Sequence, residues 1–170
     1  MDQNAIKRDK RMQTCCFTGH RRISHEQLEH VQKGLEETIR ALIQKGVIYF
    51  GAGGALGFDT LAARTVLKVK EDHPEIKLIL VLPCISQADR WDAVDRHAYE
   101  EIKQQADKVV YTAQEYTRGC MHKRNRHLVD HSGVCICYLT ETTGGAAYTV
   151  EYAQKVGVDI INLANKIAGR

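Results

Sequence analysis

Glycine-bearing segments that directly follow short apolar runs are the part of this 170-residue sequence best suited to chemistry. The first, Thr18-Gly-His-Arg-Arg22, follows an apolar run that begins at Thr14. Gly19 has no side chain, so a ligand can approach the backbone closely, and Thr18 and Arg21 can donate hydrogen bonds to phosphate. The same residues suit a tight turn with solvated arginines, so this segment alone leaves both interpretations open.

The second segment, 51–57, has four glycines in seven positions between an apolar run and a helical pattern. Because glycine has no side chain, the backbone N–H groups of this segment can face an anion at the positive end of the following helix. Leu56 stands where G-x-G-x-x-G requires its third glycine, and the lysine of a P-loop is missing, so neither fingerprint is present. Asp59 either caps the following helix or holds a ribose hydroxyl. Three of the glycines are taken as ligand-binding: Gly53, Gly54 and Gly57.

The third segment, 142–149, combines paired glycines with threonines at a predicted helix start. Gly144, Gly145 and Thr149 therefore form a further candidate phosphate site. Glu151 follows one turn into the helix, where it is either a general base or only a favourable neighbour of the helix dipole.

A basic segment, 116–126, is expected to close the site. Arg124 and Asn125 can clamp a phosphate or a sugar, although the segment equally suits a solvated basic surface. Gln87 and Trp91 are candidates for a base pocket, with internal packing as the alternative for the tryptophan.

The sequence predicts no metal centre and no disulfide. His127 and His131 are spaced as two zinc ligands on a helix would be, but no third ligand is suitably placed. No C-x-x-C pair occurs among the six cysteines, and four of them lie in apolar runs. We therefore expect reduced cysteines in the core.

Short apolar runs alternate with longer helical patterns along the chain. The runs predict strands over 14–18, 47–50, 76–82, 108–111, 134–139 and 159–163. The helical patterns predict helices from the N-cap Ser24 to Gly46 and over 58–71, 87–105, 120–131 and 146–156. Continuously apolar strands are typical of a parallel sheet covered on both faces. The sequence therefore predicts an α/β fold: a single-domain Rossmann-like sandwich, mainly parallel, with helices on both faces and all three glycine segments on one rim.

Length, charge and hydropathy set the remaining bounds. The chain suits one domain, which we place at 13–170 after a flexible basic tail over 1–12. The formal net charge of +3 fits a phosphate-bearing ligand but is too small to argue for nucleic acid alone. With no run of about 18 apolar residues and no signal peptide, we expect a cytoplasmic protein without a membrane partner.

Four motifs occur in order between the first and last predicted strands. They are Cys16-Phe-Thr-Gly-His-Arg21, Gly53-Gly-Ala-Leu-Gly-Phe-Asp59-Thr-Leu-Ala-Ala63, Cys120-Met-His-Lys-Arg-Asn125 and Thr143-Gly-Gly-Ala-Ala-Tyr-Thr149. Together they resemble the YpsA-like family of the SLOG superfamily, long catalogued as a domain of unknown function. The resemblance implies a Rossmann-like fold and a site for a nucleotide or nucleotide-derived ligand of the ADP-ribose kind, with no certain cofactor.

Two related families imply different activities. The cytokinin-activating phosphoribohydrolases have a P-G-G-x-G-T-x-x-E loop and an M-x-x-R-K stretch. The matching residues here are Gly144, Gly145, Glu151, Met121 and Arg124. By that similarity Arg124 and Glu151 would be a catalytic pair for N-glycosidic cleavage. The chain departs from the pattern at Thr143, Ala147, Tyr148 and Asn125.

DNA-processing protein A, which binds single-stranded DNA, has G-x-A-x-G-I-D and R-N-R stretches similar to Gly57-Phe-Asp59 and Arg124-Asn-Arg126. Three hypotheses follow. A sensor or binding module for a nucleotide-derived small molecule comes first, because the hydrolase motif is altered. A nucleotide N-glycosidase using Arg124 and Glu151 comes second, and a module for nucleic acid or protein comes third. Homo-oligomer formation is left open.

Overall fold

Alternating strands and helices follow the order that the apolar pattern predicts. The computed structural model describes residues 2–164; the predicted tail and domain also include residues 1 and 165–170, which lie outside that range. The strands are β1 (Thr14–Gly19), β2 (Tyr49–Ala52), β3 (Lys77–Leu82), β4 (Lys108–Tyr111), β5 (Val134–Tyr138) and β6 (Asp159–Asn162). The helices are α1 (Gln3–Met12), α2 (His25–Gln44), α3 (Phe58–Lys70), α4 (Ala93–Gln105), α5 (Cys120–Asp130) and α6 (Gly145–Lys155).

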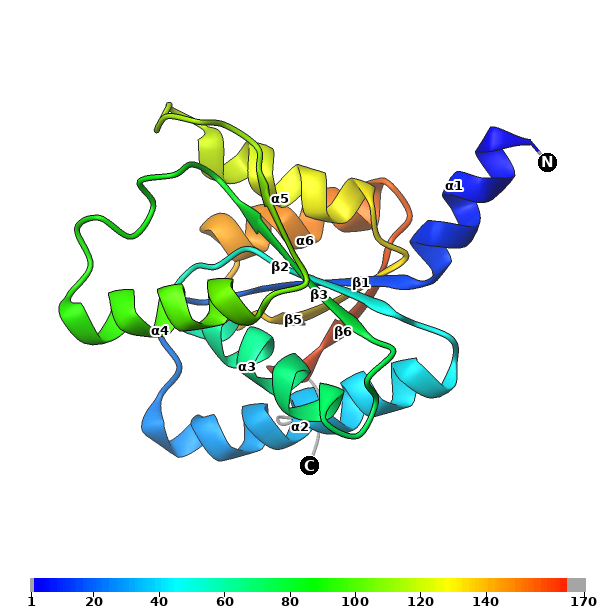
Figure 1. The fold of residues 1–170 in the computed structure, drawn as a ribbon, viewed down its shortest axis with the longest axis horizontal. Helices are drawn as coiled ribbons and strands as arrows, with labels where there is room; N and C mark the ends of the chain where they lie inside the picture. The colour runs from blue at the N-terminus through cyan, green and yellow to red at the C-terminus, as the bar shows by residue number, and fades with distance from the viewer. Residues whose placement is uncertain (1, 165–170) are drawn as a thin grey trace.

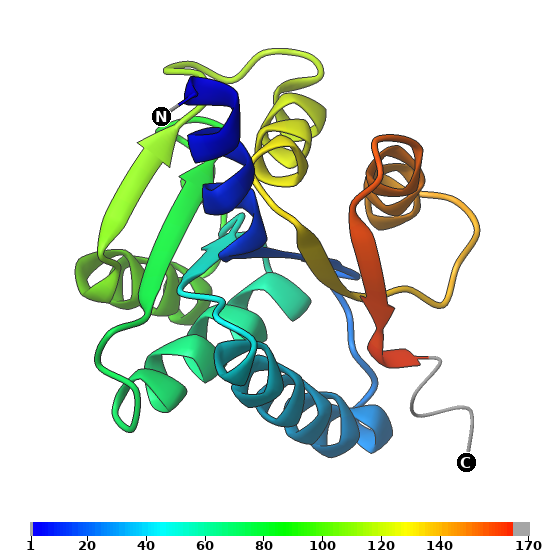
Figure 2. The same ribbon diagram turned by 90° about the vertical axis from the view of Figure 1, so that its right-hand side faces the viewer.

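The strands form one six-stranded sheet in the order β4-β3-β2-β1-β5-β6 (Figure 2). Each neighbouring pair is parallel, and β1 lies between β2 and β5, with Cys16 opposite Gly51 on one side and Cys135 on the other. The Rossmann-like α/β prediction is therefore confirmed.

Helices cover both faces of the sheet, α2, α3 and α4 on one and α5 and α6 on the other (Figure 1). Because successive strand residues point to opposite faces, Phe17 packs in the core under α2 and α3, whereas Cys16 and Cys135 pack in the smaller core under α5 and α6. All six cysteines are free and buried, and the four expected in apolar runs lie in β1 and β5.

Two segments differ from the sequence-based expectation. The helix expected from Gln87 begins at Ala93, because Asp92 caps it by accepting a hydrogen bond from the Asp95 N–H at 2.8 Å. Residues 3–12, expected as a flexible tail, form α1, which projects from the body of the molecule (Figure 1). This segment has no glycine or proline, and good helix formers dominate it.

Within residues 2–164, none of the helices combines the length and the apolar character needed to cross a membrane.

Candidate functional site

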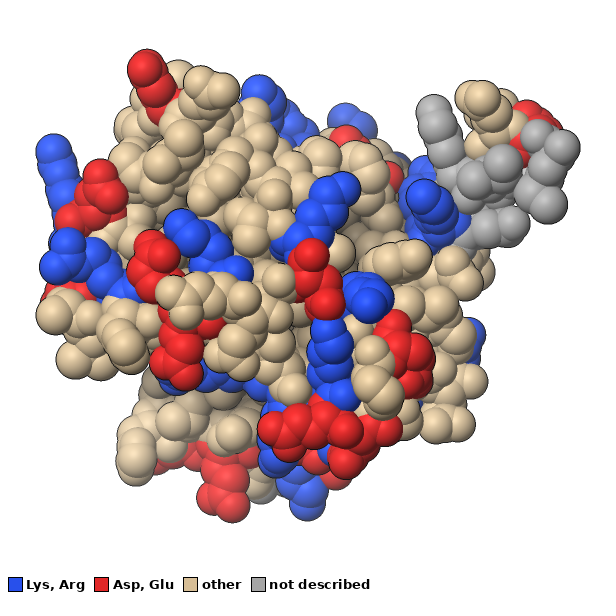
Figure 3. Space-filling view, in the orientation of Figure 1, with Lys and Arg blue, Asp and Glu red and all other residues tan. Residues whose placement is uncertain are grey.

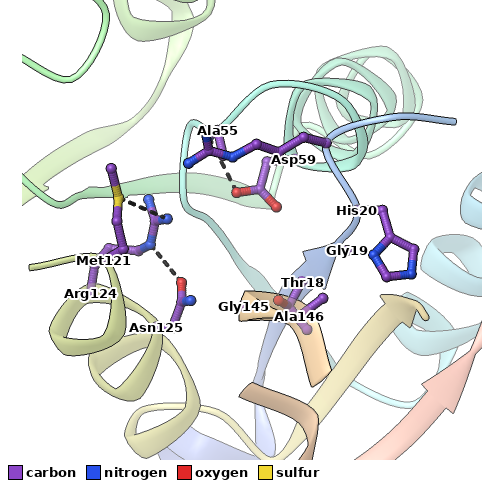
Figure 4. A pocket seen from close by; sticks show the side chains of 11 residues that line it. Thr18, Gly19, His20, Ala55, Asp59, Met121, Arg124, Asn125, Gly145 and Ala146 are labelled. Carbon is purple, nitrogen blue, oxygen red and sulfur yellow. Dashed lines mark hydrogen bonds between the residues drawn. The ribbon is translucent and has the colours of Figure 1, made fainter. Parts of the chain in front are cut away.

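A cavity of about 210 Å³ lies at the carboxyl edge of the sheet, next to the ends of β1 and β5. The chain leaves β1 towards α2 on one face and β5 towards α6 on the other, so the two connections diverge. Ligands of open α/β sheets bind at such switch points. The lining residues are Thr18, Gly19, His20, Arg21, Ala55, Asp59, Met121, Arg124, Asn125, Gly145 and Ala146 (Figure 4).

The loop after β1 is fastened to the loop after β5. His20 Nε2 accepts a hydrogen bond from the Thr140 N–H at 2.8 Å, which places the proton of a neutral imidazole on Nδ1. The His20 N–H donates to the Tyr138 carbonyl at 3.4 Å. Thr18 is buried at the end of β1, and its hydroxyl forms no hydrogen bond with the described residues. Thr18 therefore presents an unused hydroxyl to the cavity.

The loop after β2 needs glycine where charged side chains and another loop approach it. A Cβ on Gly53 would lie 2.7 Å from Arg124 Nη1 and 2.9 Å from Asp59 Oδ2. Gly57 has a φ of 77°, and a Cβ there would collide with the backbone of Arg21. The close packing of these loops explains the glycines directly: they make room for the site.

Arg124 projects from the middle of α5 into the cavity wall, with only 3% of its surface exposed. Its Nε donates to Asn125 Oδ1 at 2.7 Å, and its Nη1 donates to the Gly53 carbonyl and to Gln87 Oε1. Among the described residues, its Nη2 has only the thioether sulfur of Met121, at 3.8 Å, as an acceptor. Burial lowers the pKa of Arg124, but a guanidinium stays protonated at neutral pH. The group is thus held in place and still has donor capacity.

Asp59, in the first turn of α3, is 7% exposed and lines the same cavity (Figure 4). Its Oδ2 accepts a hydrogen bond from the Ala55 N–H at 3.3 Å, whereas Oδ1 accepts none from the described residues. Burial raises the pKa of Asp59, and the Arg124 charge, the Ala55 N–H and the Arg21 charge partly offset that effect. Among the described residues, no ion pair joins Asp59 directly to Arg124.

The N-terminus of α6 borders the cavity with free backbone amides. Its N-cap, Gly144, has a φ of 101° and no side-chain cap, and the first hydrogen bond runs from the Tyr148 N–H to the Gly144 carbonyl. The N–H groups of residues 145–147 have no acceptor among the described residues. A Cβ on Gly144 or Gly145 would meet nothing within 4 Å. These amides therefore lie at the positive end of the helix dipole with open space beside them.

The structure brings most of the predicted site residues to one place. Those that line the cavity are Thr18, Gly19, Arg21, Asp59, Arg124, Asn125 and Gly145. Gly53, Gly54, Gly57 and Gly144 lie in the bordering loops outside the lining. Thr149 is buried inside α6 and donates to the Gly145 carbonyl at 2.8 Å. Glu151 is exposed on α6 and is not among the lining residues.

Several contributors were not predicted as site residues from the sequence, although Met121 matches the M-x-x-R-K stretch. His20, Ala55, Met121 and Ala146 line the cavity. Met121 had a usable signal, because it lies three and four residues before Arg124 and Asn125 on one helix face. Gln87, expected in a base pocket, instead touches Arg124 and donates to the Gly54 carbonyl at 3.4 Å. Trp91 packs edge-on against Tyr99, with ring centroids 5.3 Å apart.

Metal ligands do not gather in the part of the chain that the structure describes, where no group of three suitable side chains occurs. The two histidines spaced like zinc ligands stack instead: the rings of His127 and His131 lie 4.2 Å apart.

Solved structures with this fold include two DNA-processing proteins. DNA processing protein A from Helicobacter pylori, described for its single-stranded DNA binding mode, has a TM-score of 0.64 at 20% identity, covering 99% of this chain and 75% of that one. DprA from Streptococcus pneumoniae has a TM-score of 0.62 at 17% identity, covering 86% of this chain and 48% of that one. Both likenesses concern the fold.

Relatives with higher sequence identity to this chain than these two structures have names that state no function. UPF0398 protein BH1768 of Halalkalibacterium halodurans is 33% identical over 135 residues, which cover 78% of this chain and 71% of the relative. A UPF0398 protein of Bacillus thuringiensis is 29% identical over 136 residues, covering 78% and 74%. The family model YpsA, described as the YspA SLOG family, matches residues 15–161. This match runs from the first strand to the last and includes every loop around the cavity, so the chain belongs to the YpsA family of SLOG proteins.

Proposed function

We propose that the protein binds a phosphate-bearing, nucleotide-type small molecule in this cavity and acts as a binding or sensing module. The observation that carries the proposal is the convergence of unused donors on one cavity: the Thr18 hydroxyl, Arg21, Arg124 and the free α6 amides. Two guanidinium groups and one carboxylate, Asp59, line it. An anion therefore compensates the excess positive charge, and helix amides favour phosphate in that position.

Isothermal titration calorimetry against AMP, ADP-ribose and NAD tests this proposal. We expect measurable binding by the unmodified protein and a loss of about tenfold or more for Arg124→Gln, since charged hydrogen bonds contribute roughly 1.5–3 kcal/mol. Arg64→Gln is the matched control, because Arg64 is exposed on α3 and lies outside the cavity lining. A folded protein that binds none of these compounds contradicts the proposal.

Hydrolysis of an N-glycosidic bond by Arg124 and Glu151 is the alternative implied by the phosphoribohydrolase motif. A general base must come within hydrogen-bond reach of its substrate, whereas Glu151 is exposed and outside the lining. We therefore expect no release of free base from nucleoside monophosphates. Catalytic base release that Glu151→Ala abolishes would favour the hydrolase instead.

Single-stranded DNA binding is a second candidate function, favoured by the similar fold of the DNA-processing proteins and by a separate groove between the end of β4 and α5. This groove has a volume of about 320 Å³, and its lining includes Tyr111, Lys123, Arg126 and His127. Basic groups beside the exposed ring of Tyr111 suit the backbone and bases of a single strand.

Fluorescence anisotropy with a labelled oligothymidine at increasing salt tests the DNA candidate. Phosphate contacts predict affinity that falls steeply with salt and weakens further in the double variant Lys123→Ala, Arg126→Ala. An affinity that does not change with salt or with this variant would rule out the groove as a DNA site.

A further inference from the structure

The cavity lining combines several hydrogen-bond donors with one carboxylate acceptor, and only the donors suit phosphate. Thr18 and the α6 amides supply donors, and the charge of Arg21, which also lines the cavity, lowers the pKa of both Asp59 and Arg124. Asp59 supplies an acceptor: it is 7% exposed, it lines the cavity, and its Oδ1 has no hydrogen-bond partner among the described residues. A phosphate that carries no proton has nothing to donate to this oxygen, and its charge would be repelled. Asp59 therefore faces a different part of the ligand.

Arg124 lies beside Asp59, and it can donate hydrogen bonds where Asp59 can accept them. Both side chains approach Gly53, since a Cβ there would lie 2.7 Å from Arg124 Nη1 and 2.9 Å from Asp59 Oδ2. No ion pair within the described residues joins them, and Arg124 Nη2 has only a sulfur acceptor. A buried acceptor and a buried donor are thus held side by side with hydrogen-bonding capacity unused.

A hydroxyl group donates one hydrogen bond and accepts others. Two adjacent hydroxyls can donate to Asp59 Oδ1 and accept from Arg124 Nη2, or from the free amide nitrogen of Asn125, whose Oδ1 is occupied by Arg124. The cavity of about 210 Å³ is smaller than the roughly 300–1,000 Å³ that enclose a whole drug-sized ligand. It therefore has room for a sugar phosphate, with the rest of a nucleotide outside.

We infer that Asp59 and Arg124 form a subsite for the 2′,3′-diol of a ribose 5-phosphate group, so that the protein selects ribonucleotides over 2′-deoxyribonucleotides and is insensitive to the base. This inference rests on the proposed phosphate site and deepens it. Asp59 is the residue that determines specificity, because it is the only carboxylate in the cavity lining within the described residues.

Paired ligands that differ by one hydroxyl test the inference in calorimetry: AMP against 2′-deoxy-AMP, and ribose 5-phosphate against 2-deoxyribose 5-phosphate. We expect each ribo compound to bind at least about tenfold more tightly, because a site built for a hydroxyl rejects an analogue that lacks it. AMP, GMP, CMP and UMP should agree within about threefold, because the cavity encloses only part of the ligand.

Asp59→Asn should reduce the ribose preference to about threefold or less while phosphate binding persists, because a neutral amide loses the charge-assisted hydrogen bond. Glu71→Gln is the matched control, since it makes the same change at the exposed opposite end of α3. Circular dichroism checks that each variant is folded, and the comparison of ligands on the unmodified protein needs no variant at all. Equal affinity for the ribo and deoxyribo partners overturns this inference alone. Failure of every phosphate compound to bind overturns the proposed function with it.

Discussion

The cavity wall contains two buried charged side chains that lie close together without forming an ion pair. Arg124 is fixed by Asn125, Gln87 and the Gly53 carbonyl, and Asp59 is fixed by the Ala55 N–H. Burying charges that do not fully compensate one another reduces stability. Such an arrangement is typical of a binding site, where the ligand completes the hydrogen bonds that folding leaves open.

At the residue scale, Gly53→Ala tests whether this geometry matters. The new Cβ would overlap the Arg124 guanidinium and the Asp59 carboxylate, so both should shift, and the affinity for AMP should fall by about tenfold or more. Gly34→Ala is the control, since its Cβ would lie 3.4 Å from Leu163, an ordinary contact. That change should leave binding intact and stabilise α2 by about 0.5–1 kcal/mol. Unchanged AMP affinity in Gly53→Ala would show that the close approach is dispensable.

At the scale of the helices, the N-caps of α4 and α2 differ in their side-chain hydrogen bonds, and this difference should appear in the free energy of unfolding. Asp92 accepts a hydrogen bond from the Asp95 N–H at 2.8 Å, whereas Ser24 occupies the N-cap of α2 without any side-chain cap bond. We expect Asp92→Ala to lower the free energy of unfolding by about 1 kcal/mol, and Ser24→Ala to have a clearly smaller effect. Urea unfolding of the two variants makes the comparison, and equal losses would contradict it.

Asp107 connects α3, β3 and β4. Its ionisation leads us to expect that the stability of the folded protein depends on pH. It accepts hydrogen bonds from Lys70 of α3 at 2.6 Å and from the Leu78 N–H of β3 at 2.8 Å, just before β4. Partial burial raises the pKa of Asp107, but these two bonds leave it below its ordinary value. A lowered pKa in the folded state stabilises the protein above about pH 4, the unfolded value, and this stabilisation is lost as pH falls through the folded value.

Asp107→Asn should therefore lower the free energy of unfolding by about 1–2 kcal/mol at pH 7, with a smaller difference from the unmodified protein at pH 3. Asp159→Asn, an exposed aspartate at the start of β6, is the control and should change little at either pH. Thermal unfolding at the two pH values measures the difference. A loss for Asp107→Asn that stays the same at pH 3 would refute the assigned ionic contribution.

For the whole molecule, the burial of the cysteines predicts how the thiols react. All six cysteines are buried, and burial raises the pKa of Cys137 to about 12. Thiols react as thiolates, so a disulfide reagent at pH 8 should modify less than one of the six in the folded protein and all six in denaturant. Fast modification of a cysteine without unfolding would show that the cores open locally.

The overall charge bears on the choice between the two candidate functions. Acidic and basic side chains are interspersed on the face seen in Figure 3. A polynucleotide is held mainly by a continuous basic surface, whereas one small anion needs only a local excess of donors. This mixed surface fits the small-molecule proposal better than a DNA site on that face.

Much of the fold could be predicted because its signals are local. The apolar runs located β4 to the residue and the other strands to within about two residues at each end. The start of α4 was missed because residues 87–92 suit a helix, and only the Asp92 cap excludes them. The contact between His20 and Thr140 spans 120 residues. Nothing in the spacing of two such residues indicates that they meet, because loop contacts depend on how the strands pair.

The sequence by itself determined the alternation of strands and helices, and with it the glycine-bearing loops at the carboxyl edge of one sheet, because hydrophobic periodicity is set by neighbouring residues. Only the tertiary structure decided which side chains enter the cavity. It placed Arg124 against Gly53 and Asp59, brought in His20 and Met121, and left Glu151 exposed outside the lining. These outcomes depend on the strand order and on the rotation of α3, α5 and α6 against the sheet, which are fixed by packing between distant segments.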